Sequence, residues 1–182
     1  LTSLALGITR TLDDVVGQSH LVGSNGTITR MLSKKRLSSI VLWGPPGCGK
    51  TTIARLLANA LEVNYVQISA IFSGVADLKK VFADAKALQE SGRATLLFVD
   101  EIHRFNKAQQ DAFLPYVENG TIILVGATTE NPSFELNSAL LSRCQVLVLK
   151  RLDDKALDEL IMRAESLLQK PLKCDENARN AV

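Results

Sequence analysis

The chain has 182 residues, of which 46% are hydrophobic and 22% are charged, and its formal net charge is +2 at pH 7. This length suits about one domain with a real core, and the composition is that of a globular protein rather than a disordered one. So small a net charge neither favours nor excludes nucleic acid, so any contact with DNA must use a local patch. No apolar run is long enough to cross a membrane, and residues 1–8 lack the basic leader of a signal peptide, so we expect no membrane partner.

The three cysteines, Cys48, Cys144 and Cys174, form no close pair and lack metal-ligand spacing. Such an odd set is typical of reduced thiols and indicates a cytoplasmic location. The first residue is not Met, and Val182 falls inside a helical pattern, so we expect the chain to be a fragment.

Short apolar runs alternate with segments of helical period along most of the chain. Residues 40–43 form an apolar run that a glycine turn ends, which predicts a buried strand. We expect further strands at 65–68, 95–99, 121–127 and 145–149, and helices at 53–61, 75–88 and 107–118. This alternation predicts an α/β fold in which helices flank a parallel sheet.

After Asp153 the pattern becomes purely helical, and Lys170 with Pro171 is expected to end that helix. We therefore divide the chain into an α/β core at residues 1–151 and the beginning of a truncated helical domain at 152–182.

A complete Walker A pattern lies between the first strand and the helix that follows it. Its residues are Gly44, Pro45, Pro46, Gly47, Cys48, Gly49, Lys50 and Thr51, and Thr52 is assigned to the same site. Glycines let backbone N–H groups turn toward phosphate oxygens, and the start of a helix adds partial positive charge. Lys50 is expected to reach the β and γ phosphates of ATP, and the Thr51 hydroxyl to bind Mg²⁺.

The alternative interpretation is a glycine- and proline-rich turn that binds nothing, which the complete match between a strand and a helix argues against. Cys48 fills a free position of the pattern, and we interpret it as a small spacer rather than a nucleophile.

Two carboxylates follow the buried run at 95–99, at the sheet edge where ligands of α/β proteins bind. We expect Asp100 to hold Mg²⁺ and Glu101 to act as general base on the attacking water. Alone, such a pair could simply cap the next helix, but a Walker A motif at this distance favours catalysis. His103 is interpreted as structural, because Glu101 already supplies the base.

Two strings resemble the RarA/MgsA family of AAA+ proteins, which includes the Werner-helicase-interacting protein. They are DEIHRFNK at 100–107, with Gln109, Gln110 and Asp111 after it, and GATTENPSF at 126–134. The resemblance implies a clamp-loader-like AAA+ ATPase, DNA-dependent, that acts in replication-fork maintenance, recombination and repair. It also implies homo-oligomers and partnership with single-stranded or forked DNA and with single-strand DNA-binding protein. Such a protein would associate with the nucleoid in a bacterium and lie in the nucleus of a eukaryote.

The resemblance assigns further roles. Val16 and Gly17, within residues 14–18, would pack on adenine, and Thr129 would be sensor 1, with Thr128 as the alternative. Ser69 stands where relatives place the partner that restrains the catalytic glutamate. Arg143 would serve the site of a neighbouring subunit.

Simpler interpretations stay open at this point. Arg143 could be a surface salt-bridge partner, and the two threonines could be ordinary strand residues. The alternative function is a nucleotide-gated scaffold that assists a clamp loader or helicase loader with little turnover of its own. An unfoldase is disfavoured, because residues 71–74 resemble an aromatic pore loop only weakly.

Overall fold

The computed structural model describes residues 9–34 and 37–169. Its centre is a five-stranded sheet in the order β2-β3-β4-β1-β5, and each neighbouring pair of strands is parallel. The strands are β1 (Ile40–Trp43), β2 (Asn64–Ser69), β3 (Thr95–Asp100), β4 (Ile122–Thr128) and β5 (Gln145–Val148). The predicted parallel α/β sheet is confirmed. No end of a strand differs from its expected position by more than one residue.

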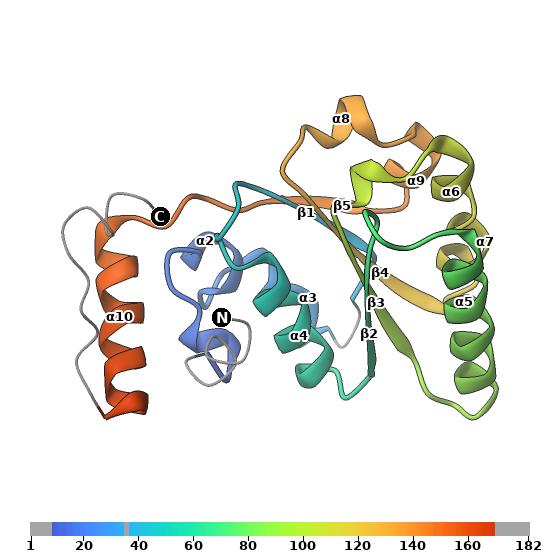
Figure 1. The fold of residues 1–182 in the computed structure, drawn as a ribbon. Helices are drawn as coiled ribbons and strands as arrows, with labels where there is room; N and C mark the ends of the chain where they lie inside the picture. The colour runs from blue at the N-terminus through green and yellow to red at the C-terminus, as the bar shows by residue number, and fades with distance from the viewer. Residues whose placement is uncertain (1–8, 35–36, 170–182) are drawn as a thin grey trace.

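Helices cover both faces of this sheet, with α5 on one side and α3 and α4 on the other (Figure 1). The helices before β3 are η1 (Leu12–Asp14), α2 (Ser19–Val22), α3 (Thr27–Ser33), α4 (Lys50–Ala60) and α5 (Val75–Glu90). Those after it are η2 (Ile102–Arg104), α6 (Lys107–Asp111), α7 (Leu114–Glu118), α8 (Pro132–Glu135), α9 (Ser138–Leu141) and α10 (Asp154–Leu168).

The two faces of the sheet form two separate hydrophobic cores, because successive side chains of a strand point to opposite faces. Leu96 and Phe98 of β3 pack with Ile53 of α4 in one core. Leu97 and Val99 pack with α5 in the other. All five residues from Thr95 to Val99 are therefore buried, as expected for an inner strand of a parallel sheet.

The single helix expected at 107–118 is divided into α6 and α7. Pro115 lies in the first turn of α7, where its missing N–H costs nothing, whereas inside a continuous helix it would clash with an earlier carbonyl. Phe113, at the division, is fully buried and lies edge-on to Phe82 of α5 with ring centroids 5.4 Å apart. The break thus turns an aromatic side chain into the core.

Helix α10 stands beside the N-terminal segment and away from the sheet (Figure 1). The Arg163 guanidinium donates a hydrogen bond of 2.5 Å to the backbone carbonyl of Asp14, which joins α10 to η1. The residues predicted to end this helix, Lys170 and Pro171, lie outside the described residues, as does Cys174. Within residues 9–34 and 37–169, no helix has both the length and the apolar character that a membrane span requires.

Candidate nucleotide-binding site

The carboxyl ends of β1, β3 and β4 meet at one edge of the sheet. Trp43, the last residue of β1, is paired with Thr128, the last residue of β4. The N–H of Gly44 continues this ladder by donating to the Thr128 carbonyl at 3.2 Å. Because β3 is the other neighbour of β4, the phosphate-loop residues and Asp100 leave the sheet from the same edge, where ligands of parallel α/β sheets bind.

The loop from Gly44 to Gly49 needs glycine for two different reasons. Gly47 and Gly49 have φ values of 76° and 98°, which L side chains rarely adopt, although a Cβ there would meet nothing within 4 Å. Gly44 is constrained by space instead, because a Cβ there would lie 2.7 Å from the Leu149 carbonyl oxygen. The end of β5 therefore holds the start of the loop in place.

Lys50 is the first residue of α4, and it is only 8% exposed. Its ammonium donates to the carbonyls of Gly44 at 2.7 Å and Pro45 at 2.8 Å. Both partners are neutral, and no carboxylate of the described residues forms an ion pair with Lys50. A buried cation held only by dipoles is a strong anion-binding group, since charge-assisted hydrogen bonds are about twice as strong as neutral ones.

The N-terminus of α4 adds to this attraction. No side chain caps the helix there, so the backbone N–H groups of its first turn are free to bind an anion. Thr51 and Thr52 belong to this turn and are half-buried. The pKa of the Cys48 thiol is raised, because the effect of burial outweighs the opposing effect of the nearby Lys50 charge. Cys48 is thus a neutral buried side chain, which is consistent with a spacer.

The predicted adenine segment lies against the start of α10. Val16 is half-buried, and Gly17 has a φ of 74°. A Cβ on Gly17 would lie 2.6 Å from Leu152 Cδ2, so the two segments are in close contact. The structure therefore brings Val16 and Gly17 beside the junction between β5 and α10.

Gln18 has a role that the sequence did not reveal. Its side chain is fully buried, donates to the Lys150 carbonyl at 2.7 Å and accepts the Lys150 N–H at 3.0 Å. The same amide nitrogen lies 3.4 Å from the Cys48 carbonyl. One side chain thus links the N-terminal segment, the phosphate loop and the chain that leads to α10. The sequence shows only a glutamine next to a glycine. It does not predict the contacts of Gln18, because its partners are distant in sequence.

The two acids at the end of β3 differ in conformation. Asp100 is the last residue of the strand, whereas Glu101 has left-handed backbone angles of φ 53° and ψ 42°. A non-glycine residue in this region carries strain, which is common at functional sites. The Glu101 carboxylate lies 3.3 Å from His103 Nε2, and the two side chains are 24% and 6% exposed.

The end of β4 presents two threonines in different surroundings. Thr128 is fully buried, and its hydroxyl lies 2.9 Å from His103 Nδ1. Thr129, the expected sensor, is half-exposed just beyond the strand. Ser69 is paired with Asp100 in the sheet, and its hydroxyl accepts the N–H of Ile71 at 3.4 Å. Among the described residues, the Glu101 carboxylate therefore contacts His103, whereas the Ser69 hydroxyl bonds to Ile71.

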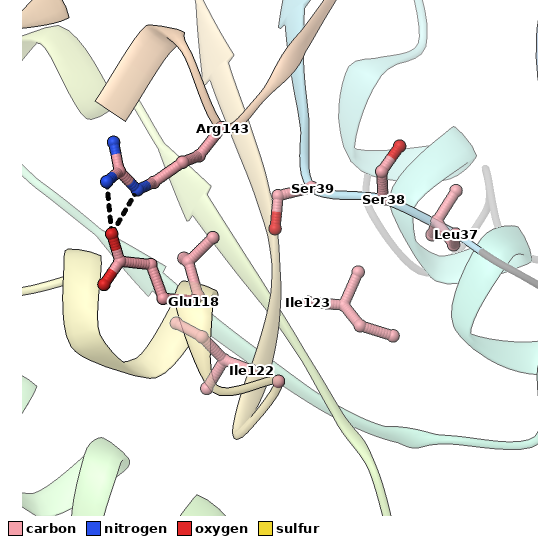
Figure 2. A pocket seen from close by; sticks show the side chains of 9 residues that line it. Leu37, Ser38, Ser39, Glu118, Ile122, Ile123 and Arg143 are labelled. Carbon is pink, nitrogen blue, oxygen red and sulfur yellow. Dashed lines mark hydrogen bonds and ion pairs between the residues drawn. The ribbon is translucent and has the colours of Figure 1, made fainter. Parts of the chain in front are cut away.

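Arg143 lies just before β5, at the amino ends of the strands and so on the side of the sheet opposite to the phosphate loop. Its guanidinium pairs with Glu118 and donates to the Ala139 carbonyl at 2.7 Å. The pair borders an open pocket of about 280 Å³ whose other lining includes Ser39 and Ile122 (Figure 2). The structure thus brings together the predicted residues of the phosphate loop and the acidic strand end but leaves Arg143 apart from them.

The donor set at the carboxyl edge fits Mg²⁺ with a nucleoside triphosphate. A buried ammonium and an uncapped helix N-terminus suit phosphate oxygens. The Thr51 hydroxyl and the Asp100 carboxylate are hard oxygen ligands, and Mg²⁺ commonly binds to proteins through one or two such groups together with substrate phosphates.

Comparison with known families gives the same indication. The profile of the "ATPase family associated with various cellular activities (AAA)" matches residues 40–152, which include the phosphate loop, both acids and Arg143. A solved structure of the RuvB Holliday junction branch migration motor of Thermotoga maritima has a TM-score of 0.69 and 31% identity, with 91% of this chain and 55% of that one covered.

Two full-length relatives are more similar in sequence. The replication-associated recombination protein A of Coxiella burnetii is 48% identical over 176 residues, which cover 94% of this chain and 40% of that protein. The ATPase WRNIP1 of Dictyostelium discoideum is 46% identical over 171 residues, which cover 92% of this chain and 20% of the relative. The chain thus spans less than half the length of these relatives. It belongs to the AAA family of ATPases, in the group formed by replication-associated recombination protein A and WRNIP1.

Proposed function

We propose that this chain is the ATP-hydrolysing core of a DNA-dependent ATPase that acts in replication-fork maintenance, recombination and repair. The observation that carries the proposal is the meeting of a complete phosphate loop with Asp100 and Glu101 at one sheet edge. Family membership supports ATP as the nucleotide, since the matched profile is that of an ATPase family. The names of the relatives support a role in replication-associated recombination.

Each residue of the edge has a proposed task. The phosphate loop and Lys50 bind the β and γ phosphates, while Thr51 and Asp100 hold Mg²⁺, whose charge offsets that developing on the phosphoryl group. Glu101 takes a proton from the attacking water. Thr129 is proposed to contact the γ-phosphate or that water, and Val16 and Gly17 to pack on adenine.

The wider assignments are also proposals. We place the division between the α/β core and a helical lid near residue 151, where the chain leaves β5 for α10. We propose a homo-oligomer that works on single-stranded or forked DNA together with single-strand DNA-binding protein. We expect a cytoplasmic protein in a bacterium and a nuclear one in a eukaryote.

Two variants of the full-length protein test the site. Lys50→Ala should abolish binding of a fluorescent ATP analogue, because the neutral loop alone cannot balance the charge of the triphosphate. Glu101→Gln keeps the shape of the side chain but removes the base, so it should retain nucleotide and lose about a hundredfold or more in turnover. Normal binding by the first variant, or normal turnover by the second, would show that the roles lie elsewhere.

Phosphate release with and without DNA separates the proposed ATPase from a nucleotide-gated scaffold. Forked or single-stranded DNA should increase turnover of the wild type and leave Glu101→Gln inactive. Low turnover that no DNA structure raises would instead favour the scaffold.

A further inference from the structure

Three side chains form a continuous chain of contacts between the ends of β3 and β4. His103 Nδ1 lies 2.9 Å from the Thr128 hydroxyl, and His103 Nε2 lies 3.3 Å from a carboxylate oxygen of Glu101. The imidazole is 6% exposed, so water competes little for either nitrogen. The histidine therefore occupies the position between the proposed base and a buried strand end.

The surroundings of Thr128 allow one consistent direction for these contacts. Its oxygen accepts the backbone N–H of Glu130 at 3.0 Å. Its single proton can go to His103 Nδ1 at 2.9 Å or to the Glu130 carbonyl at 3.2 Å, of which the imidazole nitrogen is the nearer. With Nδ1 as acceptor, the neutral ring carries its proton on Nε2, which faces Glu101 and donates to it. In this tautomer, the Glu130 N–H donates to the Thr128 hydroxyl, Thr128 donates to His103, and His103 donates to Glu101.

The backbone and the side chain of Glu101 are held by different contacts. Its left-handed conformation places the carboxylate on a strained turn between β3 and η2. Arg104 N–H closes that turn by donating to the Glu101 carbonyl at 2.8 Å, but this bond fixes the backbone only. Within the part of the chain that the structure describes, the carboxylate has its polar contact with His103 Nε2.

We propose that His103 is a positioning residue, which holds the Glu101 carboxylate in the orientation for catalysis and links it through Thr128 to the end of β4. The inference rests on the proposed function, because it takes Glu101 as the base. His103 itself need not touch the nucleotide. Its loss should lower kcat and leave both the KM for ATP and nucleotide binding nearly unchanged.

A pair of substitutions separates this role from simple packing. The amide nitrogen of glutamine reaches about as far as Nε2 of histidine, whereas that of asparagine reaches only about as far as Nδ1. His103→Gln should keep a donor to Glu101 and stay within a few-fold of wild-type kcat. His103→Asn should lose that donor and fall about tenfold to a hundredfold, the scale of a misplaced catalytic group. Thr128→Val added to His103→Asn should cause little further loss of kcat, because the effects of substitutions at residues that act through one another are not additive.

The controls use the full-length protein, with binding of a fluorescent ATP analogue as evidence of an intact fold. The other histidine, His20, is exposed on α2, and His20→Gln and His20→Asn should both turn over ATP like the wild type. Equal kcat for His103→Gln and His103→Asn, while Glu101→Gln is inactive, would overturn the positioning role alone. Full turnover by Glu101→Gln would overturn both this inference and the proposed base.

Discussion

At the scale of single residues, Gly126 sets how closely β4 approaches the turn that carries Glu101. It pairs with Val99 of β3 and Val41 of β1, so it lies in the middle of the sheet. A Cβ at this position would lie 2.9 Å from Ile102 Cδ1 and 3.2 Å from Ile102 Cγ2. Ile102 is fully buried and stands between Glu101 and His103 in the chain. The absence of one methyl group therefore allows both side chains to take their places.

Gly126→Ala should accordingly disturb catalysis as well as stability. Overpacking a buried position of this kind costs about 1–3 kcal/mol. The displacement of Ile102 should also lower kcat, because the residues on either side of it form the Glu101–His103 contact. Urea denaturation and steady-state turnover measure the two effects. Gly74→Ala is the control, since its φ is −102° and its nearest neighbour would be 3.9 Å away. Wild-type turnover by Gly126→Ala would contradict the expectation.

At the scale of elements, the nucleotide site depends on contacts between segments that are far apart in the chain. Gln18 joins the N-terminal segment to Lys150, 132 residues later, and also lies within 3.4 Å of the Cys48 carbonyl in the phosphate loop. Gly17, which also belongs to the N-terminal segment, is in contact with Leu152. A movement of α10 relative to the sheet would therefore change the surroundings of the residues proposed to contact adenine.

Gln18→Ala should show how strongly these elements depend on one another. The substitution leaves the partly buried Lys150 N–H and carbonyl without their partner, at a cost of up to about 1–3 kcal/mol for each group that water does not reach. We expect a large loss of stability in urea denaturation and weaker binding of a fluorescent ATP analogue. Gln145→Ala removes an exposed glutamine side chain from β5 and should change neither quantity. Unaltered nucleotide affinity in a folded Gln18→Ala protein would argue against the link.

Much of this arrangement could be predicted from local sequence, and the rest could not, for identifiable reasons. The buried run before Asp100 and the glycines before Lys50 are local signals, so the strands and the phosphate loop were predictable. Helices α8 and α9 have four residues each, which is too short for a helical period to be visible. The contact of His103 with Thr128 joins residues 25 positions apart and depends on strand order, which no local pattern contains.

At the scale of the whole molecule, the sheet separates the edge with the phosphate loop from the edge with Arg143. Lys50 and Glu101 lie beyond the carboxyl ends of the strands, whereas Arg143 lies before β5 at the amino ends. Four residues of β1, at about 3.3 Å each, put roughly 13 Å between these edges. Arg143 is therefore held away from the phosphate loop of its own subunit, and the proposed homo-oligomer would have to bring it to the site of a neighbour.

Mixing two inactive variants tests that arrangement. Arg143→Ala should retain ATP binding and lose about a thousandfold in turnover, the scale of an arginine that stabilises charge on a transferred phosphoryl group. Lys50→Ala cannot hydrolyse ATP but still carries Arg143. Mixed oligomers of the two should recover part of the phosphate release, because an intact site of one subunit then meets an intact arginine of the other. Mixed oligomers with no more activity than their separate parts would exclude action across an interface.

The strand order also determines when the phosphate loop can form during synthesis. β1, which carries the loop, pairs only with β4 and β5, and Ser39 at its start accepts the Leu124 N–H from 85 residues further along. A nascent chain that has emerged only as far as β3 contains the loop sequence but has no partner for the strand beneath it. Contacts between such distant segments form late and slowly. Competence to bind nucleotide should therefore arise near the end of folding, after the second half of the sheet has left the ribosome.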